Sequence, residues 1–153
     1  MSALFTLLPE AVGTIRADDK AAILRQLADR FATAYALDFH TVMERIEERE
    51  RLGSTGFGRG VAIPHARIDG LTRPVAVFFR LESPVAFDAA DGMPVDLVFG
   101  LLSPDQAGAA HLHALAAISR MMRDERMHTA LSQAPGDEAV YGLLSNVIDR
   151  DAA

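Results

Sequence analysis

The sequence predicts an α/β fold: a single-domain sandwich in which helices cover both faces of a small mixed β-sheet. Two observations support this. Amphipathic helical patterns occupy both ends of the chain, and short runs of β-branched and aromatic residues lie between them. The length of 153 residues fits one domain over residues 1–153, since a domain usually holds roughly 100–200 residues.

Two helices are predicted in the first third of the chain. The first covers about residues 18–35, where Asp18 or Asp19 can cap the N-terminus and apolar residues recur at helical spacing. The second covers about residues 39–50, with one apolar stripe among glutamates and arginines, and it ends near Gly53.

Strands are predicted over residues 61–63, 75–81 and 95–102, with a weaker strand around residues 4–8. The three stronger runs are rich in Val, Ile, Phe and Leu, and turn-rich stretches such as ESP and DAADGMP separate them. We therefore expect the sheet to be built from the middle of the chain.

Helical patterns return from Pro104 onward. A short helix is predicted near residues 126–131 and a last one over about residues 137–148. No internal repeat or interdomain linker interrupts the chain. Before these two, a helical pattern that follows Pro104 has an apolar stripe made of Leu112, Leu115, Ala116, Ile118 and Met122.

Composition excludes several classes of protein. The chain has no cysteine, which excludes disulfides, thiolate zinc sites and a cysteine nucleophile. A formal net charge of -6 argues against binding to nucleic acid or to an anionic membrane surface. No apolar stretch approaches the roughly 20 residues of a membrane helix, and the start lacks the basic region of a signal peptide. We expect a cytoplasmic protein that is not an integral membrane protein.

The most unusual stretch is GSTGFGRGVAIPHAR, residues 53–67, with four glycines in its first eight positions. It does not fit a nucleotide-binding loop, because no Lys-Ser/Thr follows and the loop lies between a helix and a strand. Two interpretations remain open. The glycines form an irregular turn, or they leave space for a partner protein to approach a neighbouring side chain.

His65 is the candidate for that side chain. Pro64 fixes its own φ and biases the preceding Ile63 toward extended geometry, so the backbone presents His65 in a narrow range of directions. A neutral imidazole is a competent nucleophile near pH 7 and can accept a phosphoryl group. The alternative is a structural histidine with no chemistry.

The stretch from Arg49 to His65, RERLGSTGFGRGVAIPH, closely resembles the signature of the fructose/mannitol class of enzyme IIA proteins of the bacterial phosphotransferase system. The resemblance continues through SPVAFDAADGMPVDLVFGLLSP and HLHALAAISRMM, so it covers most of the chain. Within the class, the PVAFDA-DG-PVDLVF segment is most similar to the nitrogen-regulatory member. The resemblance implies a mixed sheet sandwiched between helices.

The resemblance also implies the roles of three residues. The family's phosphorylated histidine falls on His65. His111 matches the second histidine, which would hydrogen-bond the active imidazole or the phosphoryl oxygens. Arg49 matches the family arginine, which would bind phosphate oxygens or pair with acidic groups of a partner. Without the resemblance, the alternative interpretation of both His111 and Arg49 is a surface residue of a helix.

Four further residues around the motif are candidate binding residues. Ser54 and Thr55 can donate hydroxyl hydrogen bonds to a phosphoryl group, although capping or turn formation would use them equally well. Arg67 would supply local positive charge. Phe57 is expected either on an exposed docking surface or in the core.

Two residues near these positions limit the site. Arg59 departs from the family, which commonly has a small polar residue between these glycines, and the extra cation is expected to alter either partner affinity or the stability of the phosphohistidine. His113 cannot face His65 together with His111, because side chains two residues apart on a helix point about 200° from each other. The same geometry makes this pair a poor metal site, so no metal and no cofactor is expected.

Three functions are compatible with these residues. A regulatory phosphocarrier would receive a phosphoryl group on His65 from a histidine phosphocarrier protein (HPr or NPr type) and bind regulatory targets according to its phosphorylation state. A sugar-transport IIA component would pass the group to a IIB domain. A binding module would carry out no phosphoryl chemistry. We expect the first, and a general hydrolase is disfavoured because no nucleophile-elbow spacing is present.

Overall fold

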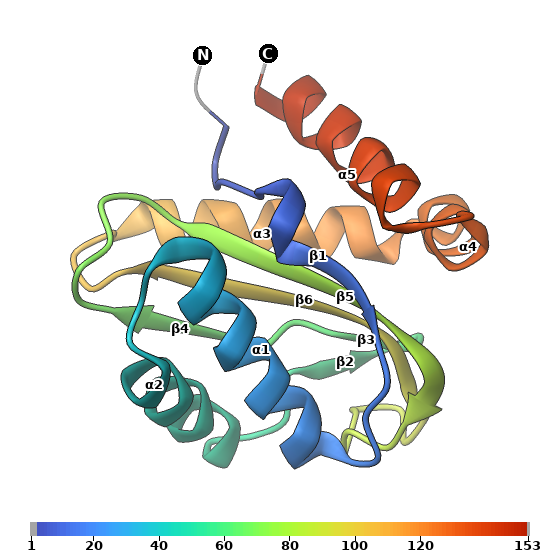
Figure 1. Cartoon of the computed structure of the whole chain (residues 1–153), viewed down its shortest axis with the longest axis horizontal. Helices are drawn as coiled ribbons and strands as arrows, with labels where there is room; N and C mark the ends of the chain where they lie inside the picture. The colour runs from blue at the N-terminus through green and yellow to red at the C-terminus, as the bar shows by residue number, and fades with distance from the viewer. Residues whose placement is uncertain (1–2, 153) are drawn as a thin grey trace.

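A six-stranded mixed sheet lies at the centre of the structure (Figure 1). The computed structural model describes residues 3–152, with side chains as far as residue 149. Its helices are α1 (Lys20–Tyr35), α2 (Phe39–Arg51), α3 (Ala109–Arg123), α4 (Glu125–Gln133) and α5 (Asp137–Ala152), preceded by a short 3-10 turn at Pro9–Ala11. Its strands are β1 (Val12–Ile15), β2 (Gly56–Gly58), β3 (Val61–Ala62), β4 (His65–Ile68), β5 (Val75–Val85) and β6 (Val95–Pro104).

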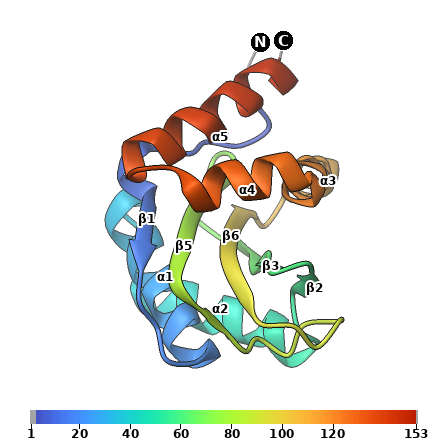
Figure 2. The same ribbon diagram turned by 90° about the vertical axis from the view of Figure 1, so that its right-hand side faces the viewer.

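Helices cover both faces of the sheet, as the sequence predicts. In Figure 1, α1 and α2 lie in front of the strands and α3 lies behind them. Figure 2 shows α3, α4 and α5 gathered on one side, away from α1 and α2. Among the residues that the structure describes, no helix combines the length and the apolar character needed to cross a membrane.

The central strand β6 places the candidate histidine. It pairs antiparallel with β5 along one edge and parallel with β3 and β4 along the other, in the registers Val61↔Leu97 and His65↔Leu101. Between β3 and β4 the strand is interrupted at Pro64. This proline has no N–H to donate, but its carbonyl accepts a hydrogen bond from Leu101 N at 2.9 Å. The interruption therefore keeps His65 on an outer strand of the sheet, while the parallel pairing with β6 continues from β3 to β4.

Helix α1 packs closely on the sheet. The side chain of Asp19 caps it by accepting from Ala22 N at 2.8 Å, which identifies the cap among the two candidates. Opposite the helix, β6 carries Gly100. A Cβ there would lie 2.8 Å from Cδ1 of Leu27 and 3.0 Å from Cε2 of Phe31, so any larger residue would force these side chains to shift.

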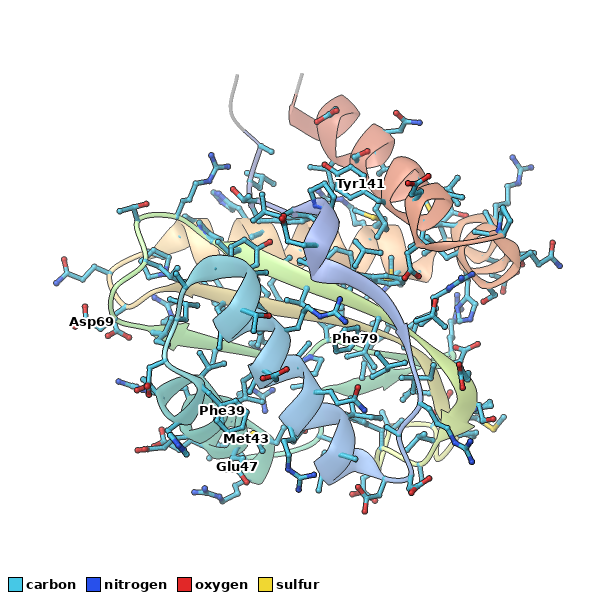
Figure 3. All side chains as sticks on the ribbon, viewed as in Figure 1. Phe39, Met43, Glu47, Asp69, Phe79 and Tyr141 are labelled. Atoms are coloured by element: carbon cyan, nitrogen blue, oxygen red, sulfur yellow. The ribbon has the colours of Figure 1, made fainter. Side chains whose placement is uncertain are left out.

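Helix α2 presents an apolar stripe to the sheet and charged residues to solvent. Asp38 caps it by accepting from Thr41 N at 2.9 Å, and Val42 and Ile46 are buried. Figure 3 shows Glu47 at the outer side of α2 and Phe79 near the centre of the molecule. The amphipathic pattern thus fixes which side of α2 faces outward.

Three short strands were not predicted: β1, β2 and β4. They contain glycine, threonine, histidine and arginine, and they are strands because β3, β5 and β6 supply hydrogen-bonding partners. The weak strand predicted at residues 4–8 amounts to one isolated bridge, Thr6↔Val75. Pairing in the folded state, which local sequence does not encode, decides these elements.

The apolar face predicted for α3 is correct at Ile118 and Met122, which are buried, but wrong at the start of the helix. The helix begins at Ala109, because β6 continues to Pro104. Leu112 is 61 % exposed, whereas His111 and Ala114 are buried against the sheet. A polar residue therefore occupies a core-facing position, and the apolar stripe alone could not reveal it.

Candidate functional site

An open cleft of about 360 Å³ lies between α2, β4 and the start of α3. Its lining residues are Arg45, Glu48, Arg49, Leu52, His65, Ala66, Arg67 and His111. Four of the candidates from the sequence therefore come together here, although they are spread over more than 60 positions: Arg49, His65, Arg67 and His111.

Strand β4 presents two of these residues through its alternation. His65 and Arg67 are half-buried on one face of the strand, and Ala66 and Ile68 are buried on the other. In the described sheet β4 pairs with β6 only, and α2 packs beside it. His65 is accessible through the cleft, which it lines.

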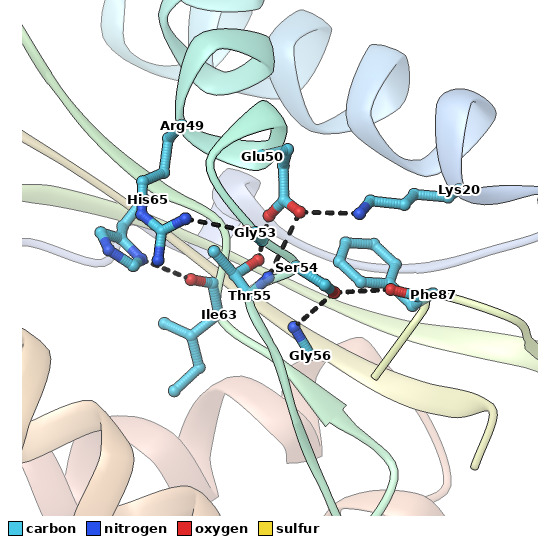
Figure 4. A network of polar contacts seen from close by, with 10 residues as sticks. All are labelled: Lys20, Arg49, Glu50, Gly53, Ser54, Thr55, Gly56, Ile63, His65 and Phe87. Atoms are coloured by element: carbon cyan, nitrogen blue, oxygen red, sulfur yellow. Dashed lines mark hydrogen bonds and ion pairs between the residues drawn. The ribbon is translucent and has the colours of Figure 1, made fainter. Parts of the chain in front are cut away.

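The imidazole of His65 is held in one orientation. Its Nδ1 lies 2.7 Å from the carbonyl oxygen of Ile63 (Figure 4). A carbonyl can only accept, so Nδ1 carries the proton and Nε2 keeps its lone pair. Burial lowers the pKa of His65, and Arg49 lowers it further, whereas the bond to Ile63 and the carboxylate of Glu50 act in the opposite direction. The ring is thus uncharged near pH 7, with a nucleophilic nitrogen.

His111 lies beside it. The two ring centroids are 5.7 Å apart, and Nδ1 of His111 is 2.7 Å from Oγ of the fully buried Ser103. Burial, then His65 and Arg67, lower the pKa of His111 to about 4. The Ser103 hydroxyl can donate to or accept from Nδ1, so it fits either protonation state of the ring. Sequence reasoning missed Ser103, since nothing in the strand pattern marks it.

Two guanidinium groups border the cleft. Nη1 of Arg49 donates to the carbonyl of Gly53 at 2.8 Å, which uses one of its five N–H groups. Arg67 lies within 3.5 Å of the carbonyl of Gly108 through Nη2. Both retain donors that can bind an anion in the cleft.

The two hydroxyl candidates do not line the cleft. Ser54 Oγ donates to the carbonyl of Phe87 at 2.6 Å and accepts from Gly56 N at 3.0 Å (Figure 4). The hydroxyl of Thr55 donates to the carboxylate of Glu50. Both hydroxyl groups therefore donate within the loop and stabilise its shape. This corresponds to turn formation, the alternative that the sequence left open for Ser54 and Thr55.

Three other residues lie apart from the cleft. Phe57 is half-buried against the core, with the guanidinium of Arg123 5.9 Å from its ring centroid, so it is not an exposed docking residue. Arg59 lines a different depression with Arg123 and His128, and His113 lines yet another. As the helix geometry predicts, His113 points away from His65 while His111 faces it.

In the described part of the chain, no group of three or more His, Asp and Glu side chains is arranged to hold a metal ion. What the cleft offers is an uncharged imidazole next to cationic donors. Such a site can accept an electrophilic phosphoryl group and compensate its negative oxygens.

The sequence also matches a known protein family. The family described as "Phosphoenolpyruvate-dependent sugar phosphotransferase system, EIIA 2" matches residues 9–147. The chain belongs to this family. Type-2 enzyme IIA proteins are phosphocarriers of the phosphotransferase system, and the resemblance identified from the motif is confirmed.

Relatives within the type-2 enzyme IIA family carry a regulatory name. The chain is 42 % identical over 129 residues to the "Nitrogen regulatory protein" of Pseudomonas aeruginosa, covering 84 % of each chain. It is 40 % identical over 138 residues to the "Nitrogen regulatory protein" of Bradyrhizobium diazoefficiens, covering 90 % of each. The crystal structure of "Nitrogen Regulatory Protein IIA-Ntr" from Neisseria meningitidis superposes with a TM-score of 0.84 at 32 % identity, covering 90 % of this chain and 95 % of the other.

Proposed function

We propose that this type-2 enzyme IIA acts over residues 1–153 as a cytoplasmic regulatory phosphocarrier of a nitrogen-related phosphotransferase system. It accepts a phosphoryl group on Nε2 of His65 from the phosphohistidine of a carrier protein of the HPr or NPr type. The observation that carries this proposal is the hydrogen bond from Nδ1 of His65 to the Ile63 carbonyl, because it leaves Nε2 unprotonated beside the cleft.

The transfer balances without a cofactor. The lone pair of Nε2 forms a new P–N bond as the P–N bond of the donor phosphohistidine breaks, and the bonding electrons return to the donor ring. The His65 ring gains positive charge during this step, while its proton stays on Nδ1. The hydrogen bond to the Ile63 carbonyl strengthens as that charge develops, so it stabilises the transition state more than the ground state.

Cationic groups compensate the phosphoryl oxygens. Arg49 and Arg67 provide N–H donors in the cleft that His65 lines, and the neutral ring of His111 adds its Nε2–H when its Nδ1 accepts from Ser103. Phosphoryl transfer depends mainly on such positioning and charge compensation. We assign Arg49, Arg67 and His111 as the phosphoryl-binding residues of this site.

Phosphorylation would also control partner binding. It adds roughly -1.5 to -2 charges at one point of the surface. Leu52 is 84 % exposed at the rim of the cleft and offers an apolar contact for a regulatory target. A target seated on Leu52 and on unmodified His65 would meet a dianion after phosphorylation, and desolvating it there would cost several kcal/mol. The relatives' name, nitrogen regulatory protein, supports this role.

The test is phosphoryl transfer from phosphoenolpyruvate through enzyme I and a purified carrier of each type. The label should be acid-labile and alkali-stable, as expected for a phosphoramidate, and absent from His65→Ala. His111→Ala should slow transfer by about one to two decades, because one hydrogen bond to a charged group is lost. His113→Ala is the matched control: it lies on the same helix outside the cleft and should behave as the original protein does. Equal labelling of His65→Ala would contradict the assignment.

The regulatory step needs its own measurement. A partner isolated with the unphosphorylated protein should bind the phosphorylated protein and His65→Glu more weakly. Equal affinities for the phosphorylated and unphosphorylated forms would rule out the switch.

A sugar-transport IIA component remains the second candidate, because the family description names a sugar phosphotransferase system. In that case the phosphorylated protein would pass its label rapidly to a IIB domain. A protein that takes no label from either carrier would instead be a binding module.

A further inference from the structure

An ion pair outside the cleft connects the start of α1 to the end of α2. Nζ of Lys20, the only lysine in the sequence, lies 2.8 Å from Oε2 of Glu50. The side chain of Glu50 is 6 % exposed and that of Lys20 is 22 % exposed. A carboxylate buried this far needs a compensating cation and further hydrogen bonds. The groups that donate to Glu50 are therefore the ones that the ion pair holds in place.

Both oxygens of Glu50 also accept from Thr55 (Figure 4). The backbone N–H of Thr55 donates to Oε2 at 3.2 Å, and its hydroxyl donates to Oε1. On the other side of the pair, Nζ of Lys20 lies 4.6 Å from the ring centroid of Phe87, whose carbonyl accepts from Ser54. The ion pair thus anchors two consecutive residues of the glycine-rich loop.

Two more hydrogen bonds connect Thr55 to the candidate nucleophile. Ile63 N donates to the carbonyl of Thr55 at 3.0 Å, and Nδ1 of His65 donates to the carbonyl of Ile63 at 2.7 Å. The contacts run without a gap through Lys20, Glu50, Thr55, Ile63 and His65.

We propose that the Lys20–Glu50 ion pair is a positioning element for His65: by holding Thr55 it keeps the Ile63 carbonyl where Nδ1 must donate, which leaves Nε2 free for the phosphoryl group. The proposal rests on the proposed function of His65 as phosphoryl acceptor. Neither Lys20 nor Glu50 lines the cleft, so both act through Thr55 and Ile63 rather than on the reacting atoms.

The physical reason is that a neutral imidazole can carry its proton on either nitrogen. Only the Nδ1–H form presents a lone pair at Nε2. The fixed carbonyl of Ile63 selects that form, and its position depends on the loop held by Glu50. A loosened loop would let the ring change its tautomer or rotate, and the fraction of productive rings would fall.

The charge of the pair also reaches His65. Glu50 raises the pKa of His65, and Lys20 offsets the Glu50 charge. Glu50→Gln should therefore lower the pKa of His65, and Lys20→Met should raise it. Loss of structure alone would not move the two variants in opposite directions. The other charged or titratable groups around His65 are Arg45, Glu48 and Arg49 of α2, Arg67 of β4 and His111 of α3.

The central experiment compares Thr55→Val with Thr55→Ser in the full chain. Valine keeps the size of the side chain and the backbone N–H but lacks the hydroxyl, whereas serine keeps the hydroxyl. We expect Thr55→Val to slow labelling of His65 about tenfold and to reduce the Nδ1–H population of His65 in ¹⁵N spectra. Thr55→Ser should restore both to within about twofold. The control is Glu47→Gln, an exposed position outside the cleft on α2, the helix that carries Glu50. It should change neither the labelling rate nor the Nδ1–H population.

Lys20→Met and Glu50→Gln complete the test, with thermal unfolding measured for every variant. Slower labelling with pKa changes of opposite sign supports the proposal. If folded Thr55→Val keeps both the labelling rate and the Nδ1–H form, or if both charge variants move the pKa the same way, the proposal is wrong. Absence of label on the original protein would instead reject the proposed function, and the ¹⁵N spectra would still test whether Glu50 sets the tautomer.

Discussion

Phosphorylation of His65 should change the protonation of His111. Burial and two neighbouring groups hold the pKa of His111 at about 4, so its ring is neutral near pH 7. A phosphoryl group on His65 adds roughly -1.5 to -2 charges next to that ring. Because negative charge favours the imidazolium form, the pKa of His111 should rise.

The separation of the two rings sets the magnitude. At 5.7 Å and an effective dielectric constant of about 20, one unit charge interacts with another by about 3 kcal/mol. The phosphoryl charge then stabilises the imidazolium by about 4 to 6 kcal/mol, and each pKa unit corresponds to about 1.4 kcal/mol. The pKa of His111 should therefore rise from about 4 to about 7 or above. A large share of the phosphorylated molecules would then carry a proton on His111 at neutral pH.

Ser103 makes this change of protonation feasible. Its hydroxyl lies 2.7 Å from Nδ1 of His111 and can accept from that nitrogen once the ring is charged. The charged ring would then donate from Nε2 toward the phosphoryl oxygens. The imidazolium would stabilise the phosphorylated state through a charge-assisted hydrogen bond.

The assay is an NMR titration of the His111 ring in the unphosphorylated and phosphorylated protein. Arg67→Gln checks the direction independently: Arg67 is one of the groups that lower the pKa of His111, so its removal should raise that pKa without any phosphoryl group. A rise of less than about one unit on phosphorylation would refute the reasoning, because it would mean that His111 does not face the modified nitrogen.

Two further predictions concern stability. The free energy of unfolding should fall by up to about 3 kcal/mol as the pH decreases from about 6.5 to about 4, because the unfolded chain binds a proton at His111 before the folded one does. His111→Gln should remove this part of the pH dependence, measured by urea unfolding at a series of pH values. The same pH dependence in the variant and the original protein would contradict the prediction. Gly100→Ala should destabilise the fold by about 1–3 kcal/mol, because the new Cβ would lie 2.8 Å from Leu27. Gly142→Ala, within α5 where nothing lies within 4 Å, is the control and should not destabilise, because alanine favours a helix. A Gly100→Ala protein as stable as the original would show that α1 yields without cost.

The local sequence determined the elements with strong periodicity and singled out the residue that we propose as the nucleophile. The amphipathic stretches that became α1 and α2, and the apolar runs that became β5 and β6, are encoded by residues close together in the chain. The GSTGFGRGVAIPH stretch singled out His65 because glycine and proline restrict the backbone through local sterics alone. The same local chemistry was enough to recognise the enzyme IIA family.

Only the tertiary structure decided which side chains meet around that histidine. Strands β1, β2 and β4 exist because other strands pair with them, and β4 carries His65. Ser103 reaches His111 because β6 and α3 pack together, and Glu50 pairs with Lys20 because α1 and α2 lie side by side. Hydrogen bonds and ion pairs between distant segments depend on distances of a few ångströms, which neither periodicity nor composition encodes.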